Sequence, residues 1–349
     1  MMLLPWHQDI WQQLVERRAS GRFPHALLLC GPAGLGQRAF AERAVAMLLC
    51  ERDAEAPCGQ CRSCKLFAIR SQRDPEETRP DGSLAQPDGY SGHPDARFVG
   101  HALNEKSNPK KMYTELVVDQ IRDLSAWLAL PPQFGRAQVA LLDPADELNV
   151  AAANALLKTL EEPGDRRHLI LLSSSPARLS ATIRSRCQRI DFHLPSTAQA
   201  LAWLGAEGID AKTAAAALEA NGGNPGVALN SARNGGLALR EEVVADLRGI
   251  ASGKSSAVEV ANRWSKSEPE TRLWFAGALV QAEAQAQARG ASGPLALTLH
   301  GDLTKLAAWF DQVNRARGQL RGPLRPELVL LEVLSTWGVP APRRSSMLA

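Results

Sequence analysis

The sequence predicts an α/β protein built on a mostly parallel, doubly wound sheet, and two observations support this fold class. Short apolar runs recur in the first half of the chain and alternate with segments that have helical spacing of apolar residues. Strands that alternate with helices form a parallel sheet with helices on both faces. The first apolar run also leads into a glycine-rich loop, as in phosphate-binding folds. The predicted strands are residues 26–30, 138–143 and 168–173.

Helices are predicted between and beside these strands. In the segment that separates the last two strands, Ala152, Leu156 and Leu160 recur every four residues and therefore share one helical face. Pro163 then marks a helix end. The predicted helices are residues 6–18, 37–50, 118–130 and 151–162.

The glycine-rich loop keeps the spacing of a P-loop but lacks its reactive residues. An active loop continues after its last glycine with Lys, which neutralises phosphate charge, and with Ser or Thr, which binds Mg²⁺. Here these positions hold Gln37, which is uncharged, and Arg38, which offers no oxygen to a metal. The predicted site is therefore a degenerate nucleotide site that does not hydrolyse ATP. It consists of Gly31, Gly34, Gly36, Gln37, Arg38 and Asp143.

Asp143 ends the second predicted strand and occupies the Walker B position, where a carboxylate coordinates Mg²⁺. The next residue is Pro144, which can neither polarise water nor bind a metal. Asp146 and Glu147 are interpreted as a solvated turn. Losses at both motifs point to an inert site. The competing hypothesis is an active ATPase that uses Arg38 for phosphate and Asp143 for Mg²⁺.

Four cysteines are clustered and predict a metal site. Cys50, Cys58, Cys61 and Cys64 are separated by seven, two and two residues. Such a cluster in a chain without an export signal favours metal over disulfides. Four thiolates are typical of a closed structural zinc site. An iron–sulfur cluster and a set of free buried thiols remain as alternatives.

The composition argues against several classes of protein. The net charge of +3 is too small to indicate a dedicated nucleic-acid binder, but it does not exclude a local basic patch in the folded protein. No run approaches the roughly 20 apolar residues of a membrane span, and the first residues do not resemble a signal peptide. We therefore expect a soluble, cytoplasmic protein with no membrane partner.

Two further segments have distinct composition. Residues 71–94 are rich in Pro, Asp, Gly and Ser and predict a long surface loop or flexible insertion, for which the sequence suggests no function. After about residue 195, strand-like runs disappear and Ala-rich helical segments dominate. Residues 339–349 predict a disordered tail.

Several strings together resemble the AAA+ clamp-loader subunits of bacterial DNA polymerase III. They are Pro24-His25-Ala-Leu-Leu-Leu, the glycine loop, the four cysteines, Asn154-Ala-Leu-Leu-Lys-Thr-Leu-Glu-Glu-Pro163 and Ser185-Arg186-Cys187. The resemblance covers roughly residues 5–230. Because both nucleotide motifs are degenerate, the chain is most similar to the non-hydrolysing stator of that complex.

The resemblance implies a role for Arg186 as an arginine finger that reaches the ATP site of a neighbouring subunit. Residues 182–189, taken alone, predict only a polar, charged loop, and Arg184 is the rival arginine. The implied partners are the ATP-hydrolysing γ/τ subunit, the δ subunit, the sliding clamp and primer–template DNA. ATP and Mg²⁺ would be bound by partner subunits, and the location would be the cytoplasmic, nucleoid-associated replisome.

The resemblance also implies a domain order. Residues 1–192 would form an AAA+ nucleotide-binding-like domain with a zinc module at about 50–70 and the flexible insertion at about 71–94. Residues 193–236 would form a small helical lid, and residues 237–338 an all-helical collar for oligomerisation. A zinc-dependent DNA-binding module that works outside a loader is the remaining rival function.

Overall fold

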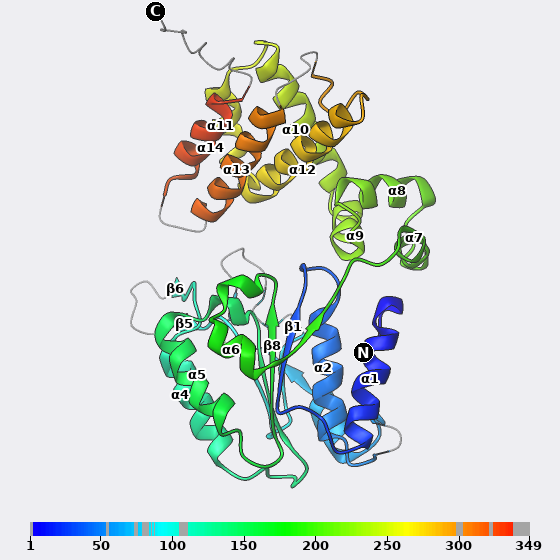
Figure 1. Ribbon diagram of the computed structural model, residues 1–349, viewed down its shortest axis with the longest axis vertical. Coiled ribbons are helices and arrows are strands. Elements are labelled where there is room, and N and C mark those ends of the chain that lie inside the picture. The colour runs from blue at the N-terminus through cyan, green and yellow to red at the C-terminus, as the bar shows by residue number, and fades with distance from the viewer. Residues whose placement is uncertain are drawn as a thin grey trace, which may run out of the picture. The chain divides into compact units, whose positions relative to one another are not determined.

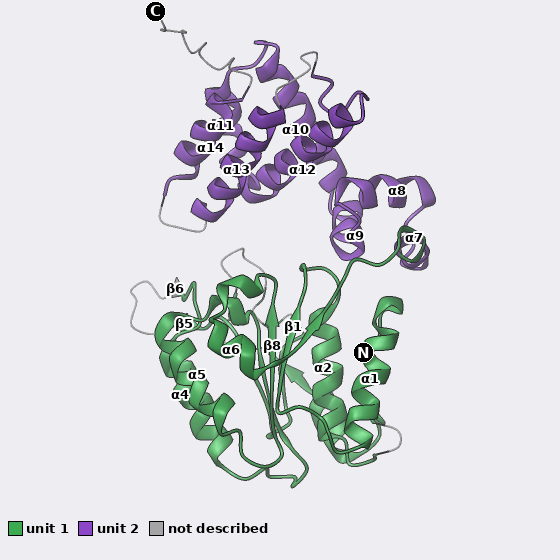
Figure 2. Cartoon of the chain, in the orientation of Figure 1, with its two compact units in different colours: residues 1–199 green, residues 200–349 purple. Residues whose placement is uncertain are grey.

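The computed structural model describes residues 3–53, 56–72, 76–78, 84, 86, 88–104, 111–297, 303–320 and 324–337. The chain forms two compact units, Met1–Gln199 and Ala200–Ala349, which are described separately (Figure 2). The predicted disordered tail at 339–349 lies outside the described residues. Within the described ranges, no helix is long and apolar enough to cross a membrane.

The first unit is organised around a five-stranded parallel sheet, which confirms the predicted α/β class (Figure 1). The three predicted strands are present to within one residue. The inner strands are buried and almost wholly apolar, because helices cover both faces of a parallel sheet. In spatial order the strands are β4 (Ala96–Val99), β7 (Gln138–Leu142), β8 (Arg167–Ser173), β1 (Ala26–Cys30) and β9 (Gln188–Asp191).

Each face of this sheet packs on its own apolar core. Successive side chains of β1 alternate between the two cores, since a strand has a period of two. Leu27 and Leu29 belong to one core, and Ala26 and Leu28 belong to the other. The first core includes α1 (Gln8–Ala19, after the 3-10 helix Pro5–His7) and α2 (Gln37–Leu49), and the second includes α4 (Val118–Ala129), α5 (Val150–Glu161) and α6 (Ala181–Arg186).

The two edge strands and α6 were not predicted. The segment 182–189, expected to be a polar loop, forms most of α6 and the start of β9. Ile183 anchors α6 because its side chain is fully buried in the second core. Among the described strands β9 lies at the sheet edge with β1 as its neighbour, and its sequence, Gln188–Asp191, is mixed in polarity and lacks an apolar run.

The described part of the 71–94 segment belongs to the first unit and is partly buried in it. Its ends form a short antiparallel pair, and Gln86 is only 1% exposed. The described residues are therefore a mixture, since Gln72, Glu76 and Asp88 are exposed as expected of a surface loop, whereas Glu77 and Gln86 are buried. Residues 73–75, 79–83, 85 and 87 lie outside the description. The small elements nearby are α3 (Arg62–Ala68), β2 (Arg70–Ser71), β3 (Tyr90–Ser91), β5 (Leu103–Asn104) and β6 (Lys111–Met112).

Every element in the described part of the second unit is a helix, as the composition predicts. Two apolar clusters are present, one around Leu204 and Leu218 and a larger one around Trp264 and Trp309. The helices are α7 (Thr197–Ala206, which begins in the first unit), α8 (Ala211–Ala220), α9 (Pro225–Arg233), α10 (Gly236–Ala251), α11 (Ala257–Trp264), α12 (Pro269–Ala288), α13 (Leu303–Gln319) and α14 (Pro326–Ser335).

Candidate functional site

The glycine-rich loop lies between β1 and α2, where the sequence predicts it. Gly34 and Gly36 have φ angles of 92° and 82°, which belong to the left-handed region that glycine tolerates. A Cβ added to Gly31 would lie 2.7 Å from the carbonyl oxygen of Phe192 and 2.9 Å from its Cβ. The backbone path and the close approach of Phe192 therefore require glycine at these three positions.

Gln37 turns back into its own loop. Its Nε2 donates a hydrogen bond of 2.7 Å to the carbonyl oxygen of Pro32, and the residue is 8% exposed. In an active P-loop the Lys at this position reaches the β- and γ-phosphates. The side chain of Gln37 brings no positive charge and is engaged by the loop itself.

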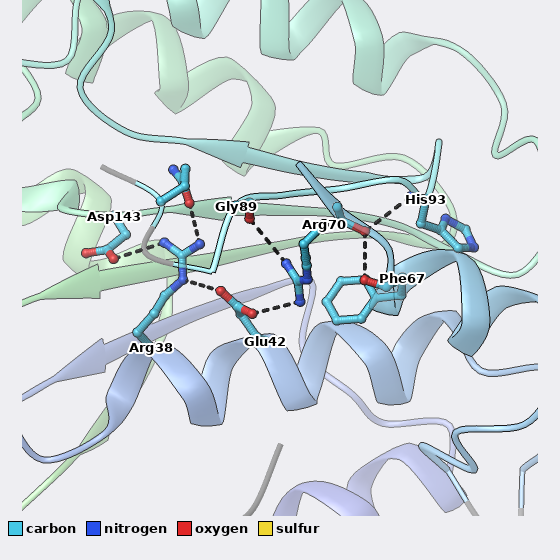
Figure 3. A network of polar contacts seen from close by, with 9 residues as sticks. Arg38, Glu42, Phe67, Arg70, Gly89, His93 and Asp143 are labelled. Atoms are coloured by element: carbon cyan, nitrogen blue, oxygen red, sulfur yellow. Dashed lines mark hydrogen bonds and ion pairs between the residues drawn. The ribbon is translucent and has the colours of Figure 1, made fainter. Parts of the chain in front are cut away.

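Arg38, in the first turn of α2, forms an ion pair with Asp143, the residue that follows β7 (Figure 3). The distance from Nη1 of Arg38 to Oδ2 of Asp143 is 3.0 Å. Nε donates to Glu42 Oε1 at 2.7 Å, and Nη2 donates to the side-chain oxygen of Gln86. The guanidinium thus joins the two positions that the sequence predicts to correspond to the Mg²⁺-binding positions of an active enzyme.

The ion-pair network continues beyond Glu42. This residue is 1% exposed, and its Oε2 accepts a hydrogen bond of 2.8 Å from Nη2 of Arg70 (Figure 3). The ring of Phe98 faces both cations, with its centroid 4.9 Å from Cζ of Arg38 and 5.3 Å from Cζ of Arg70. Negative and positive groups alternate from Asp143 to Arg70, so each enclosed charge has a compensating neighbour.

Sequence reasoning missed three members of this network. Glu42 had a detectable signal, since it lies four residues after Arg38 on the same helix and such pairs face each other. For Arg70 and Gln86 the sequence contains no local pattern that indicates a contact with Arg38 or Glu42. Gln86 is held by a hydrogen bond of 2.8 Å from Nε2 of Gln72 to its carbonyl oxygen, a contact within the 71–94 segment.

The turn after β7 is packed rather than solvated, so the expectation for Asp146 and Glu147 is wrong. Both belong to the short 3-10 helix Ala145–Glu147, in which Asp146 is 6% exposed. Oε2 of Glu147 lies 2.7 Å from Nε2 of His101, which is itself 1% exposed. The segment before α4 covers the turn, because the backbone N–H of Leu116 donates to the carbonyl of Glu147.

The four predicted metal ligands, Cys50, Cys58, Cys61 and Cys64, are brought together by the fold. Their Sγ atoms all lie within 4.8 Å of one another. The Cys50–Cys61 and Cys58–Cys64 pairs are each 4.0 Å apart. A zinc–sulfur bond of about 2.3 Å corresponds to a tetrahedral sulfur–sulfur edge of about 3.8 Å, so the spacing suits such an ion. The cluster can hold a metal such as zinc.

Backbone N–H groups point at sulfurs of this cluster. The N–H of Cys61 donates to Sγ of Cys58 at 3.3 Å, and the N–H of Cys64 donates to Sγ of Cys61 at 3.4 Å. Hydrogen bonds from the backbone of Gln60 and Cys61 lower the pKa of Cys58 to about 6, whereas burial raises the pKa of Cys64. The amide donors favour the thiolate, which is the form that binds metal.

Arg186 ends α6 and is half-buried, with 34% of its side chain exposed. Its Nη2 lies 2.7 Å from Oε1 of Glu161 at the end of α5, and its Nη1 donates to the carbonyl of Thr182 at 3.2 Å. Arg184 is exposed on the same helix. Arg186 is thus held in a defined position, while part of its side chain faces solvent.

Comparisons with known proteins agree on one family. The family model "DNA polymerase III, delta subunit" matches residues 6–196. DNA polymerase III subunit delta' of Pseudomonas aeruginosa is 36% identical over 278 residues, which are 78% of this chain and 75% of that protein. Subunit delta' of Yersinia pestis is 30% identical over 95% of this chain and 94% of that protein.

A more distant relative belongs to the same polymerase. DNA polymerase III subunit tau of Bacillus subtilis is 30% identical over 186 residues, which are 53% of this chain and 27% of tau. The family model matches more than half of the chain, and the alignments with the delta' relatives extend over most of it. Both comparisons therefore indicate the same family. The chain belongs to the delta' family of DNA polymerase III subunits.

Proposed function

We propose that this chain is the non-hydrolysing stator subunit of a DNA polymerase III clamp loader, which loads the sliding clamp onto primed DNA during replication. Its proposed partners are the ATP-hydrolysing γ/τ subunit, the δ subunit, the clamp and primer–template DNA. Relatives named as delta' and tau subunits of this polymerase support membership of the complex. In this proposal residues 1–192 are an AAA+ domain, 193–236 its lid and 237–338 the collar that joins subunits.

The ion pair between Arg38 and Asp143 is the observation that carries the non-hydrolysing part of the proposal. Mg²⁺ binding at a P-loop needs a hydroxyl oxygen at position 38 and an available carboxylate at position 143. Arg38 supplies N–H donors and a positive charge instead, and it engages Asp143 directly at 3.0 Å. A metal would have to displace this cation, and Gln37 would still leave the phosphates without a lysine.

Arg186 is proposed to act in trans on the ATP site of a neighbouring subunit. A guanidinium has five N–H donors in a planar fork, and two hydrogen bonds to Glu161 and Thr182 leave three of them. The exposed part of the side chain is therefore able to meet a phosphate oxygen. In well-studied switches such an arginine is worth roughly 10³ to 10⁵ in rate.

The cysteine cluster is proposed to hold a structural zinc ion. Four sulfur ligands leave no open coordination position for a substrate or water, which is typical of structural sites. In this proposal zinc fixes the segment between α2 and α3 and takes no part in ATP hydrolysis.

The proposal is tested by measuring ATP turnover of the reconstituted loader with clamp and primed DNA. The wild type is compared with Arg186→Ala, and Arg184→Ala serves as the matched control on the same helix. We expect the isolated chain to be inactive, Arg186→Ala to lower kcat of the complex at least tenfold, and Arg184→Ala to have little effect. Size-exclusion chromatography verifies that each complex assembles.

Other outcomes refute separate parts of the proposal. Turnover of ATP by the isolated chain would mean that Arg38 does not disable the site. Normal turnover with Arg186→Ala, in an assembled complex, would mean that this arginine is not used in trans.

A further inference from the structure

The carboxylate of Glu161 lies at an unfavourable place on its helix. Glu161 is the last residue of α5, where unpaired backbone carbonyls give the helix a partial negative charge and disfavour another anion. The guanidinium of Arg186 compensates the negative charge of this carboxylate, because its Nη2 lies 2.7 Å from Oε1 of Glu161. Glu162, the next residue, is also acidic and exposed, but it has no ion pair within the described residues.

The two helices that carry this pair are fixed relative to each other. α5 and α6 lie side by side (Figure 1). Ile183 of α6 is buried in the same apolar core as Leu156 and Leu160 of α5. Close-packed side chains hold helix backbones in place. The core therefore fixes the backbone of Glu161 relative to the backbone of Arg186, independently of the ion pair between their side chains.

The contacts of Arg186 hold both arms of its guanidinium. Nη1 donates to the carbonyl of Thr182 within α6, and Nη2 donates to Glu161 on the neighbouring helix. Contacts at the two terminal nitrogens restrict the rotation of a long side chain that would otherwise sample several rotamers. These two contacts use two of the five N–H donors of the guanidinium, and 34% of the side chain is exposed.

We infer that Glu161 is a positioning residue for Arg186, which holds the guanidinium ready for a phosphate oxygen of a nucleotide bound to a neighbouring subunit. The inference rests on the proposed action of Arg186 in trans. Orientation before the reaction lowers the entropy cost of reaching the transition state, so loss of Glu161 should slow turnover without weakening ATP binding by the neighbour.

The test uses the full reconstituted loader with clamp and primed DNA, and it measures kcat and KM for ATP. We expect Glu161→Ala to lower kcat on the order of tenfold with KM nearly unchanged. Glu161→Gln keeps an oxygen acceptor at the same distance and should recover most of the lost activity. Glu162→Ala, the matched control at the adjacent position, should behave as wild type.

A double variant separates positioning from a general structural effect. If Glu161 acts through Arg186, Glu161→Ala combined with Arg186→Ala should be no slower than Arg186→Ala alone. Additional loss in the double variant, or unchanged or faster turnover with Glu161→Ala, would overturn the inference. A normal rate with Arg186→Ala would refute the proposed function as well, whereas a slow Arg186→Ala beside a normal Glu161→Ala would refute only the role of Glu161.

Discussion

Nη1 of Arg38 lies 3.0 Å from Oδ2 of Asp143, although the two residues are 105 positions apart in the sequence. In the proposed degenerate nucleotide site, Arg38 stands where an active P-loop holds its metal-binding hydroxyl, and Asp143 stands at the Walker B position. An arginine here does more than remove a ligand, because it neutralises the carboxylate that Mg²⁺ would need. This pairing joins the changed position 38 to the carboxylate that the chain retains at position 143.

The first prediction concerns the stability that this network provides. Arg38→Ala should lower the free energy of unfolding of the isolated chain by about 2–4 kcal/mol, because Asp143 and Glu42 lose their shared cation in an enclosed setting. Millimolar Mg²⁺ should restore part of this loss in the variant and none in the wild type. Urea denaturation with and without Mg²⁺ measures both effects.

The control for this experiment is an exposed ion pair. Arg122 and Asp119 are 3.5 Å apart, with 71% and 69% of their side chains exposed. Arg122→Ala should cost below about 0.5 kcal/mol. Equal effects of Arg122→Ala and Arg38→Ala would show that the Arg38 network contributes no special stability.

The second prediction is that nucleotide binding can be restored without hydrolysis. Gln37→Lys combined with Arg38→Thr returns the charge and the hydroxyl of an active loop. This double variant should bind MgATP in isothermal titration calorimetry, and it should remain inactive because Pro144 offers no carboxylate to polarise water. Gln37→Lys alone should bind much more weakly, since Arg38 still engages Asp143. Turnover by the double variant would contradict the role given to Pro144.

The third prediction is the metal content of the cysteine cluster. Elemental analysis should find one zinc ion per chain, and Cys61→Ser should lose it, because the remaining three sulfurs cannot complete a tetrahedron. Cys187→Ser is the control, since this buried thiol lies outside the cluster and burial raises its pKa to about 12. Iron in place of zinc, or normal zinc content in Cys61→Ser, would refute the assignment.

Removal of the metal should loosen only its surroundings. Zinc binding in small modules is worth on the order of 10 kcal/mol of folding free energy. Chelation should therefore accelerate hydrogen exchange in α3 and the residues before it, while β1, β7 and β8 stay protected by the two cores of the sheet.

The fourth prediction is a loss of stability in mild acid. Burial lowers the pKa of His168 below its ordinary value of 6.5, although a contact with the carbonyl of Pro24 opposes this shift. The unfolded chain therefore binds the proton more readily than the folded chain. The free energy of unfolding should be fully present above about pH 6.5 and should fall below it, by up to about 1.4 kcal/mol per pH unit for each such histidine.

Urea denaturation at several values between pH 7.5 and 5.5 measures this dependence. Burial also lowers the pKa values of His7 and His93, so these residues add to the effect. His168→Gln should reduce the dependence, because it removes one of the buried imidazoles. An NMR titration of the His168 imidazole in the wild type checks the direction of its pKa shift, and a value at or above 6.5 would refute the prediction.

Local patterns were sufficient to predict the central elements. β1 and its loop were recognisable because a buried strand is a continuous apolar run and glycine spacing is a local property. The edge strands β4 and β9 were missed because strands with one exposed edge mix polar and apolar residues. α6 was missed for a similar reason, since only Ile183 among its six residues is buried.

The sequence by itself determined the fold class, the glycine loop with its missing lysine and hydroxyl, and the four cysteines with metal-ligand spacing. Each depends on residue types at short, fixed separations. Only the tertiary structure decided that Arg38 pairs with Asp143, that Gln86 accepts a hydrogen bond from Arg38, and that Glu161 forms an ion pair with Arg186. These contacts join distant parts of the chain, and their partners are selected by the packing of the sheet and helices rather than by any local pattern.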